Sequence, residues 1–476
     1  MKIYYCSSEA FPFSKSGGLA DVAASLPKAL QNHGHQVKIF IPLYQQNLKD
    51  INKFTHLGHH VINIQDDAYG VDYYETDYNG ITYTLIYNEK LFDRPNYYGY
   101  EDDDVRFLFF NLAIIEYIQV FNDMPDIIHI NDYQTALVPY LLDSLYKPKF
   151  PEFKHIKTLL TIHNLEKQGS FPIETEKLLG QKSFAYLHLD QVNYLKTGIM
   201  RANAINTVSE SYHQEILTKF YGFNLQGPLK SRQYQLFGIL NGFDESLYNP
   251  KTSSFLSLNY DENTFTVGKN KNKEVLLKQL NLNLDSKKPM VAFINRFARQ
   301  KGIDILMPIL ESYLDNEAFT FIVLGKGAVL YEAYFDELQK KYPNLVYYQN
   351  SFDLELSQKV YAASDLFLLP SLFEPCGLNH MIAMKFGALP IVRETGGLKD
   401  TVTPYNKFTG IGVGFTFKNN DRDELKEIID NALDLYHHDK VSFDDMIHQA
   451  MHVQHSMDKM ANQYEELYTK LLLNEI

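Results

Sequence analysis

The stretch Pro370–Val402, PSLFEPCGLNHMIAMKFGALPIVRETGGLKDTV, decides the fold. The apolar run Leu366–Leu369 just before it has the length and composition of a buried strand. Leu378–Phe386 carries apolar residues at helical spacing and stops at a glycine, and Leu389–Val392 is another short buried strand. Thr395–Leu398 then begins a further helix. This alternation of strands and helices predicts an α/β fold with a parallel sheet.

Two consecutive strand ends in this stretch present different chemistry to the same edge of the predicted sheet, where ligands of doubly wound folds bind. The first carries a carboxylate in a tight turn, which would repel an anion. The second carries a Gly-Gly pair at a helix N-terminus, where backbone N–H groups can approach an anion. A sugar phosphate or nucleotide sugar fits both loops; the alternative is a structural turn followed by an ordinary helix cap. The candidate binding residues are Glu374, Cys376, Gly377 and Leu378 in the first loop, and Thr395, Gly396 and Gly397 in the second.

The N-terminal region contains a near copy of the Gly-Gly loop. Lys2–Cys6 is a predicted strand, and the helix after it ends near Gly34, with Pro27 predicting a kink or a break. Val37–Ile41 is the next strand. Because both Gly-Gly loops follow a strand and begin a helix, we expect two Rossmann-like domains with the ligand in a deep cleft between them. The candidate residues of the N-terminal copy are Lys15, Gly17, Gly18 and Asp21.

Other predicted strands also end in polar or aromatic residues. The expected boundaries are residues 1–245 for the N-terminal domain, 246–455 for the C-terminal domain with 246–285 as the connection, and 456–476 for a terminal helix. In the first domain the strand ends carry Asp132, His163, Asn164 and Asn241; in the second they carry Arg296, Lys301 and Phe352.

The bulk composition restricts the class of protein. A chain of 476 residues favours two domains, and 45% hydrophobic with 22% charged residues is typical of a soluble globular protein. A net charge of −13 argues against nucleic-acid binding. No apolar run has membrane-spanning length, no signal-peptide core precedes the first strand, and there are only two cysteines, so we expect a cytoplasmic protein.

Three cations are candidates for binding a diphosphate. Arg296 and Lys301 share one loop after a strand, and Lys15 belongs to the other domain. Together they would stabilise the charge on a departing nucleoside diphosphate without a metal, although each alone could be a solvated surface residue. His163 is expected to contact sugar hydroxyls, with a structural hydrogen-bonded role as the alternative; the same alternatives hold for Asp132. No metal or cofactor is expected, since the histidines at 448, 452 and 455 lack a further ligand and suit a surface face.

These motifs together resemble the bacterial and plant glycogen/starch synthase family of retaining glycosyltransferases, over essentially the whole chain. The matching segments are Lys15–Val22, Phe92–Arg94 with Tyr98-Gly99, Thr161–Leu165, Gly238–Gly242, Arg296 with Gln300–Gly302, and Phe373–Leu378. The resemblance implies a GT-B fold whose terminal helix crosses back to the first domain. It implies metal-free transfer of α-glucose from ADP-glucose to the non-reducing end of an α-1,4-glucan such as glycogen, with retention.

The resemblance also implies roles at matching positions. The three cations would hold the diphosphate, the Gly396-Gly397 loop the phosphate and Glu374 the glucosyl unit. His163, Asp132 and Asn241 would line the sugar site, and Phe352 would stack on adenine. The leaving phosphate itself would act as the base.

Several positions depart from the family pattern. Tyr133 and Tyr248 replace tryptophans, Ser16 replaces threonine, and Asn379-His380 replaces a polar-Gln pair after the Glu374 loop. Two other classes remain open: another GT-B enzyme, such as a glucan phosphorylase or a nucleotide-sugar epimerase, and a catalytically silent glucan-binding protein. Preference for ADP- or UDP-glucose, acceptor length and oligomeric state also stay open.

Overall fold

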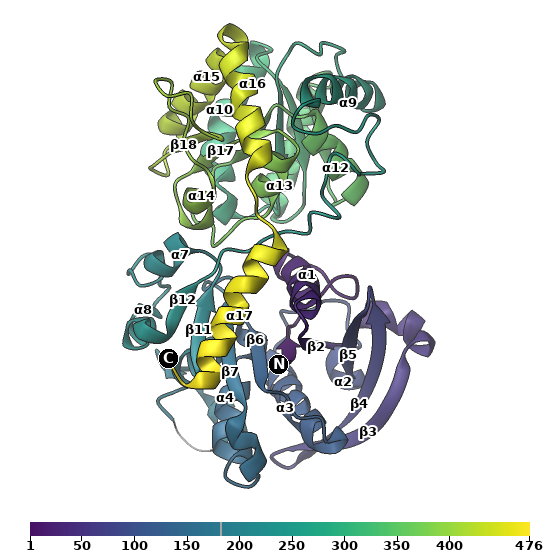
Figure 1. The fold of residues 1–476 in the computed structure, drawn as a ribbon, viewed down its shortest axis with the longest axis vertical. Coiled ribbons are helices and arrows are strands. Elements are labelled where there is room, and N and C mark those ends of the chain that lie inside the picture. Colours follow the sequence, from purple (N-terminus) through teal and green to yellow (C-terminus); the bar gives the residue numbers. More distant parts are fainter. Residues whose placement is uncertain (181–182) are drawn as a thin grey trace. The chain divides into compact units, whose positions relative to one another are not determined.

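The structure is a computed structural model that describes residues 1–180 and 183–476, and it divides into two compact units (Figure 1). Unit 1 comprises Met1–Gly242 together with Met457–Ile476, and unit 2 comprises Phe243–Ser456. The C-terminal helix therefore belongs to the same unit as the N-terminal strand.

Unit 1 is built on a nine-stranded sheet with the order β12-β11-β7-β6-β1-β2-β5-β4-β3. Pairing is parallel from β12 to β5, and β4 and β3 are added as antiparallel strands. The predicted parallel α/β core is thus confirmed. The strands are β1 (Lys2–Cys6), β2 (Gln36–Pro42), β3 (Thr55–Ile64), β4 (Asp67–Tyr78), β5 (Ile81–Tyr87), β6 (Ile127–Asn131), β7 (Lys157–Ile162), β11 (Ala204–Thr207) and β12 (Leu236–Gly238).

Helices cover this sheet, and the longest are α1 (Gly18–Asn32), α3 (Asp103–Phe121) and α17 (Met457–Leu473). The predicted break at Pro27 is wrong, because α1 continues through this residue with Leu26 and Leu30 buried on its inner face. The shorter elements are α2 (Glu89–Phe92), α4 (Val138–Leu141), α5 (Glu176–Leu179), α6 (Tyr194–Arg201), α7 (Glu210–Glu215), α8 (Gln226–Ser231) and a small sheet of β8 (Ser170–Phe171), β9 (Leu187–His188) and β10 (Gln191–Asn193).

The C-terminal helix α17 lies beside α1 (Figure 1) and is fastened to it by ion pairs. His33, just after α1, places Nε2 at 2.8 Å from Asp458 and Nδ1 at 3.2 Å from Glu465. These hydrogen bonds to two carboxylates, mainly the one to Asp458, raise the pKa of His33. A protonated His33 therefore strengthens the contact of α17 with α1.

The inner face of α17 contributes polar groups to a buried layer at the sheet of unit 1. The Tyr468 hydroxyl lies 2.7 Å from Nδ1 of His129, whose Nε2 lies 2.7 Å from Oγ1 of Thr161. The Tyr464 hydroxyl accepts from Nδ2 of Asn206 at 2.8 Å. All five side chains are fully buried, so each polar group needs its partner.

Unit 2 is built on a six-stranded, fully parallel sheet with the order β15-β14-β13-β16-β17-β18. The strands are β13 (Met290–Ile294), β14 (Thr320–Leu324), β15 (Val346–Gln349), β16 (Leu366–Leu369), β17 (Leu389–Arg393) and β18 (Phe415–Phe417). The helices are α9 (Phe265–Gln279), α10 (Ile303–Asp315), α11 (Val329–Lys341), α12 (Leu354–Ala363), α13 (Asn379–Lys385), α14 (Gly396–Thr401), α15 (Arg422–His438) and α16 (Lys440–His452).

The segment 246–285, predicted as a connection, is part of the packing of unit 2. Its helix α9 is buried against α12, and the ammonium group of Lys269 donates to three backbone carbonyl oxygens. These are the oxygens of Ala362 (3.1 Å), Ser364 (2.7 Å) and Phe386 (3.0 Å). Lys269 thereby binds the C-terminal ends of α12 and α13, where a cation is favoured by the helix dipole.

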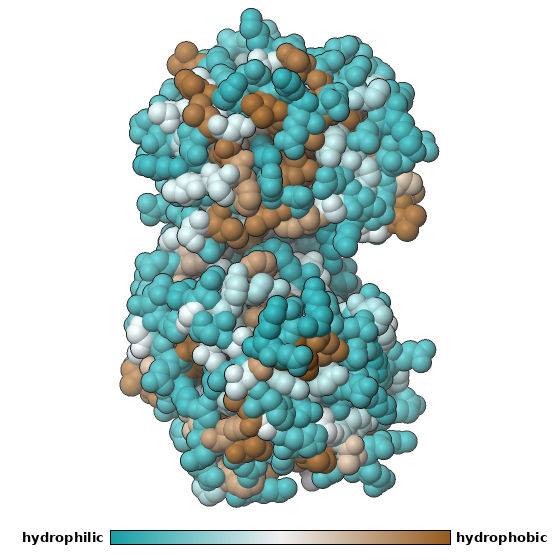
Figure 2. Space-filling model, turned by 90° about the vertical axis from the view of Figure 1, so that its right-hand side faces the viewer, coloured by the Kyte–Doolittle hydropathy of each residue, from teal (hydrophilic) through white to brown (hydrophobic). Residues whose placement is uncertain are grey.

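Hydrophilic residues predominate on the molecular face drawn in Figure 2, and hydrophobic ones form small groups between them. Among the helices of residues 1–180 and 183–476, none is both long and apolar enough to cross a membrane. Both cysteines, Cys6 and Cys376, are buried free thiols.

Candidate functional site

The first part of the candidate site lies in unit 1, in the loop between β1 and α1. Lys15 forms a 2.6 Å ion pair with Asp21 in the first turn of α1. Burial raises the pKa of Asp21, and the positive charge of Lys15 partly offsets this effect. The ammonium group of Lys15 is thus held at the N-terminus of α1, where the helix dipole adds to its attraction for an anion.

The carboxylate of Glu9 holds this loop in place through hydrogen bonds. Its buried carboxylate accepts the backbone N–H of Ser16, the Ser16 hydroxyl at 2.6 Å and the Tyr98 hydroxyl at 2.6 Å. The Tyr97 hydroxyl in turn accepts the backbone N–H of Lys15 at 3.4 Å. Because Glu9 is satisfied by hydrogen-bond donors, it fixes the backbone of the loop and leaves the lysine charge to other partners.

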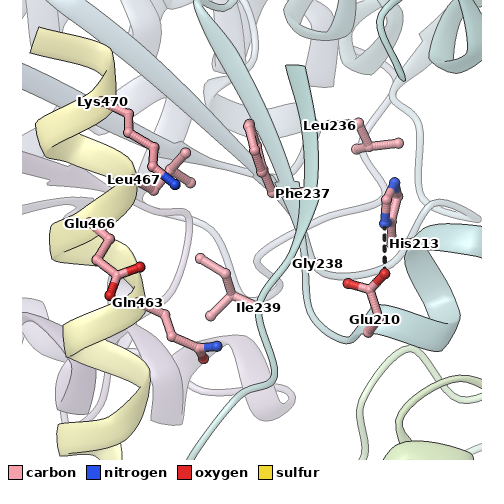
Figure 3. A pocket seen from close by; sticks show the side chains of 10 residues that line it. All are labelled: Glu210, His213, Leu236, Phe237, Gly238, Ile239, Gln463, Glu466, Leu467 and Lys470. Carbon is pink, nitrogen blue, oxygen red and sulfur yellow. Dashed lines mark ion pairs between the residues drawn. The ribbon is translucent and has the colours of Figure 1, made fainter. Parts of the chain in front are cut away.

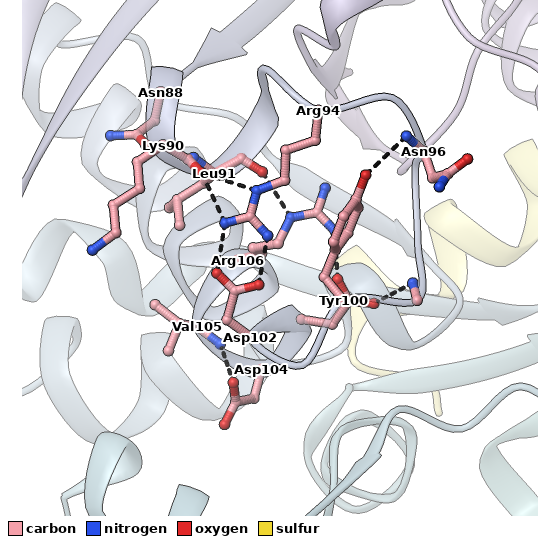
Figure 4. A network of polar contacts seen from close by, with 12 residues as sticks. Asn88, Lys90, Leu91, Arg94, Asn96, Tyr100, Asp102, Asp104, Val105 and Arg106 are labelled. Carbon is pink, nitrogen blue, oxygen red and sulfur yellow. Dashed lines mark hydrogen bonds and ion pairs between the residues drawn. The ribbon is translucent and has the colours of Figure 1, made fainter.

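A network of polar contacts fixes the segment that carries Tyr97 and Tyr98 (Figure 4). Arg94 binds both carboxylate oxygens of Asp102, at 2.6 and 2.7 Å. Arg106 is fully buried and donates to the carbonyl oxygens of Leu91 (2.7 Å) and Tyr97 (3.2 Å). A bidentate arginine holds its partner in a fixed geometry. The network therefore fixes Tyr97 and Tyr98 in the positions from which they contact Lys15 and Glu9.

The second group in unit 1 lies at the adjacent carboxyl ends of β6 and β7. Oδ1 of Asp132 accepts the backbone N–H of His163 at 2.7 Å and that of Asn164 at 3.4 Å. Burial raises the pKa of Asp132 to about 7, although both hydrogen bonds act against the rise. Burial also lowers the pKa of His163 to about 3, so its ring is neutral at neutral pH. Asn241, the remaining residue singled out in this unit, is buried in the segment after β12.

In unit 2 the turn after β16 places Glu374 beside Lys301. Oε2 of Glu374 lies 2.6 Å from Nζ of Lys301 and accepts the Ser371 hydroxyl at 3.0 Å. The Glu374 side chain is only 6% exposed and that of Lys301 14%. The two residues that the sequence assigns to the sugar and to the phosphate are thus directly paired.

The Gly396-Gly397 loop packs against the Glu374 turn at backbone level. The Gly397 N–H donates to the Glu374 carbonyl oxygen at 3.1 Å. A Cβ on Gly396 would stand 2.0 Å from that oxygen, and a Cβ on Gly397 would stand 2.3 Å from the Cys376 carbonyl oxygen. These glycines are therefore required by the contact between the two loops, whatever they bind.

Gly17, at the N-cap of α1, differs from this pair. A Cβ on Gly17 would have nothing within 4 Å, and its φ of −161° suits any residue. The two Gly-Gly loops are alike in sequence and in strand–turn–helix context, but packing requires both glycines of the loop in unit 2 and does not require Gly17. The local fold does not require a glycine at position 17.

Two other predicted residues of unit 2 present exposed side chains. Arg296 follows β13, and its exposed guanidinium has no hydrogen-bond or ion-pair partner among the described residues. Phe352 follows β15, and 52% of its surface is exposed. An exposed guanidinium can bind an anion, and a half-exposed aromatic ring can stack on a planar group; the two strand ends that carry them are separated by β14.

Asn379 and His380, two of the residues that depart from the family pattern, connect α13 to neighbouring elements of unit 2. Asn379 donates to the Ile294 carbonyl oxygen at the end of β13, at 2.7 Å. His380 is fully buried, and its Nε2 lies 2.6 Å from the Thr401 hydroxyl in α14. Its Nδ1 has no hydrogen-bond partner within the part of the chain that the structure describes. Burial, and secondarily the charges of His455 and Lys301, hold the pKa of His380 well below its usual value.

An open pocket in unit 1 lies apart from the predicted residues (Figure 3). It opens beside β12, the edge strand of the sheet, and is lined by α7 and α17 on its two sides. None of its lining residues is among the candidate site residues, although Gly238 and Ile239 belong to one of the segments that resemble the family. Across the described residues, no group of three His, Cys, Asp or Glu side chains is arranged to hold a metal ion.

Two residues of the site architecture were not found from the sequence. Arg393 at the end of β17 is buried and donates to the Ser371 carbonyl oxygen at 2.8 Å and to that of Leu372, which fixes the start of the Glu374 turn. Glu9 was also missed, although its place shortly after a strand that ends in a ligand loop was an available signal. No local pattern marked Arg393, because its partners come from another strand end.

The two Rossmann-like units, with charged loops at the carboxyl ends of parallel strands, define a glycosyltransferase of the GT-B-like fold. A family model described as "Starch synthase catalytic domain" matches residues 2–231, and one described as "Glycosyl transferases group 1" matches residues 277–443.

Curated relatives and a solved structure narrow this class. The chain is 45% identical to a glycogen synthase of Acholeplasma laidlawii over 100% of both chains. It is 40% identical to a glycogen synthase of Clostridium acetobutylicum, over 99% of this chain and 100% of the relative. The catalytic domain of starch synthase IV from Arabidopsis thaliana, bound to ADP and acarbose, superposes with a TM-score of 0.92 at 32% identity, covering 99% of each chain. The chain belongs to the glycogen and starch synthase family.

Proposed function

We propose that this protein transfers α-glucosyl units from ADP-glucose to the non-reducing end of an α-1,4-glucan such as glycogen, with retention and release of ADP. The observation that carries the proposal is the Lys301–Glu374 pair, held 2.6 Å apart beside the Gly396-Gly397 loop. A buried carboxylate next to a cation suits a ligand that has hydroxyl groups at one end and a diphosphate at the other. The ADP found with the related starch synthase supports the adenine nucleotide.

The binding roles that we propose for individual residues follow from the geometry within each unit. In unit 2, Arg296 and Lys301 hold the diphosphate, Phe352 stacks on adenine, and Glu374 accepts hydrogen bonds from the glucosyl hydroxyls. In unit 1, Lys15 adds positive charge for the phosphates, and His163 contacts the sugar. The other proposed binding residues are Gly17, Gly18, Asp21, Asp132, Asn164 and Asn241 in unit 1, and Cys376, Gly377, Leu378, Thr395, Gly396 and Gly397 in unit 2.

The proposed chemistry needs no group beyond the substrates and these side chains. The bond between the anomeric carbon and the phosphate oxygen breaks, and ADP departs with the electron pair. The acceptor hydroxyl attacks the anomeric carbon from the same face, and its proton passes to the departing phosphate. Lys301 and Arg296 stabilise the charge that develops on that phosphate, which is where preorganised cations contribute most to rate.

Release of ADP in the presence of glycogen tests this proposal. Wild-type protein is expected to turn over ADP-glucose, and the comparison with UDP-glucose decides the nucleotide preference. Glu374→Ala and Lys15→Ala are expected to lower kcat/KM by about 100-fold or more. The matched controls Glu427→Ala and Lys49→Ala change exposed residues of the same two types and should leave turnover unchanged. Undiminished turnover in Glu374→Ala and Lys15→Ala would refute the assigned roles.

The other classes left open by the sequence have their own readouts in this experiment. Phosphate-dependent release of glucose 1-phosphate from glycogen would indicate a glucan phosphorylase, and conversion of the nucleotide sugar without glycogen would indicate an epimerase. Glycogen binding without ADP release would indicate a silent glucan-binding protein. We propose a cytoplasmic location, which the two free thiols fit.

A further inference from the structure

Asn131, the last residue of β6, is oriented unambiguously by its surroundings. It is fully buried, and its Nδ2 donates to the Cys6 carbonyl oxygen of β1 at 3.0 Å. A backbone carbonyl can only accept a hydrogen bond. The amide nitrogen of Asn131 must therefore face Cys6, and its Oδ1 must face the opposite way.

Oδ1 of Asn131 lies within hydrogen-bond distance of two groups. The Tyr5 hydroxyl donates to Oδ1 of Asn131 at 3.1 Å, and Nε2 of His163 lies 2.9 Å from the same atom. Because the amide oxygen accepts only, Nε2 of His163 must carry a proton. The low pKa of His163 makes the ring neutral, so this is its one ring proton and Nδ1 is a bare acceptor. Nδ1 has no hydrogen-bond partner among the described residues.

The buried polar residues on the inner face of α17 and in the sheet also hold Tyr5, the hydrogen-bond partner of Asn131, in place. The Tyr5 ring packs at 4.7 Å, edge to face, on His129, which is itself held through both nitrogens by Thr161 and Tyr468. The Asn131 amide therefore cannot turn without breaking its hydrogen bonds to Tyr5 and Cys6 of β1 and to His163, just after β7. Besides His129, whose pKa burial holds low, the nearby titratable group is Asp132, which binds the backbone and not the ring of His163.

We propose that Asn131 is a positioning residue that holds His163 as the Nε2–H tautomer, so that Nδ1 accepts a hydrogen bond from a hydroxyl of the transferred sugar. The role of Nδ1 rests on the proposed function, whereas the tautomer rests on the protein alone. A fixed acceptor selects a group that can donate, and it disfavours a phosphate oxygen or a fluorine at that place. Asn131 would thus act on specificity through His163 without touching the substrate.

The tautomer can be read directly by nitrogen NMR on the full chain with labelled histidine. The His163 signals are assigned by their loss in His163→Phe. In wild type we expect a protonated Nε2 and an unprotonated Nδ1. In Asn131→Leu, which cannot accept, we expect that preference to be lost. Asn206→Leu is the matched control, because Asn206 is an equally buried asparagine of the same sheet, on β11, that does not touch His163. A wild-type ring protonated at Nδ1 would overturn the proposal even if no variant folds.

Kinetics separate a positioning role from a merely structural one. We expect Asn131→Leu to lower kcat/KM for ADP-glucose about 10-fold, the loss of one hydrogen bond to the substrate. Because Asn131 acts through His163, adding Asn131→Leu to the His163→Phe variant should not lower kcat/KM any further. Losses that multiply in the double variant would overturn the proposal while leaving the proposed function intact. Absence of ADP release by the wild type would instead refute the proposed function and the sugar contact, and the NMR result would stand by itself.

Discussion

Nζ of Lys301 lies 2.6 Å from Oε2 of Glu374, and both side chains are largely withdrawn from solvent. Each charge is thus balanced by the other before any ligand arrives. A substrate with a negative diphosphate would compete with Glu374 for Lys301 and would offer hydroxyl groups to Glu374 in exchange. The pair is therefore both a structural contact and a preorganised part of the proposed site.

Breaking this pair from one side should destabilise unit 2. Lys301→Met leaves the Glu374 carboxylate buried without a cation, and we expect the free energy of unfolding to fall by about 3 kcal/mol. The double variant Lys301→Met/Glu374→Gln removes both charges and should recover most of that loss while staying inactive. Urea denaturation followed by circular dichroism measures the first effect, and ADP release the second. A double variant as unstable as the single one would contradict this account.

The two Gly-Gly loops should respond differently to alanine. Gly397→Ala places a methyl group against Cys376, so we expect the free energy of unfolding to fall by about 2 kcal/mol. Gly17→Ala meets open space and should leave stability within about 0.5 kcal/mol of wild type.

The same Gly17→Ala variant tests for a ligand at the N-terminus of α1. If a phosphate approaches the backbone there, the added methyl group should lower kcat/KM for ADP-glucose about 10-fold with stability unchanged. Gly227→Ala, where a Cβ also meets nothing, is the control for the substitution itself. Full activity in Gly17→Ala would remove Gly17 from the proposed binding residues.

Asp132 should make the protein less stable as the pH rises. Its pKa is about 7 in the folded protein, against 3.8 for an aspartate in water, so the folded protein binds more protons between these values. The free energy of unfolding therefore falls as the pH increases from about 4 to 7. Asp132→Asn keeps an acceptor for the His163 N–H and should reduce this slope. Urea titrations of both proteins across that range measure the difference, and parallel curves would refute the assignment.

His380 should have the opposite pH dependence. Its folded-state pKa lies well below 6.5, so the unfolded chain binds more protons in acid and stability falls as the pH drops below about 6.5. His380→Gln removes the titrating imidazole and its unpartnered Nδ1. We expect the free energy of unfolding to rise by about 1 kcal/mol at neutral pH, and by more in acid. Thermal unfolding at several pH values checks it; a constant difference would show that His380 does not titrate in this way.

The sequence predicts the strands well because each is a short buried run bounded by glycine, proline or polar residues. Lys2–Cys6 and Leu366–Leu369 are strands with the predicted bounds. Of the kink or break predicted at Pro27, the break does not occur, because tertiary burial of α1 outweighs the missing hydrogen bond. The polar composition of the segment 246–285 does not reveal that Lys269 is buried and binds α9 to the ends of α12 and α13.

The candidate site could be predicted only as a set of loops. Strand ends and glycines are local signals, so Lys15 and Glu374 could be named as candidates. The sequence could not show that Lys301 pairs with Glu374, or that Asn131 orients His163, because these contacts join distant segments. Which glycine serves packing and which is free for a ligand is also a matter of neighbours in space, and the two similar motifs concealed that difference.

The placement of α17 in unit 1 affects the order in which the two units can fold during synthesis. All strands of unit 1 have been made once β12 is complete, but Tyr464 and Tyr468, which cover the buried His129, come near the end of the chain. The whole of unit 2 leaves the ribosome in between. Unit 2 can therefore fold first, and unit 1, although it starts the chain, closes its core last.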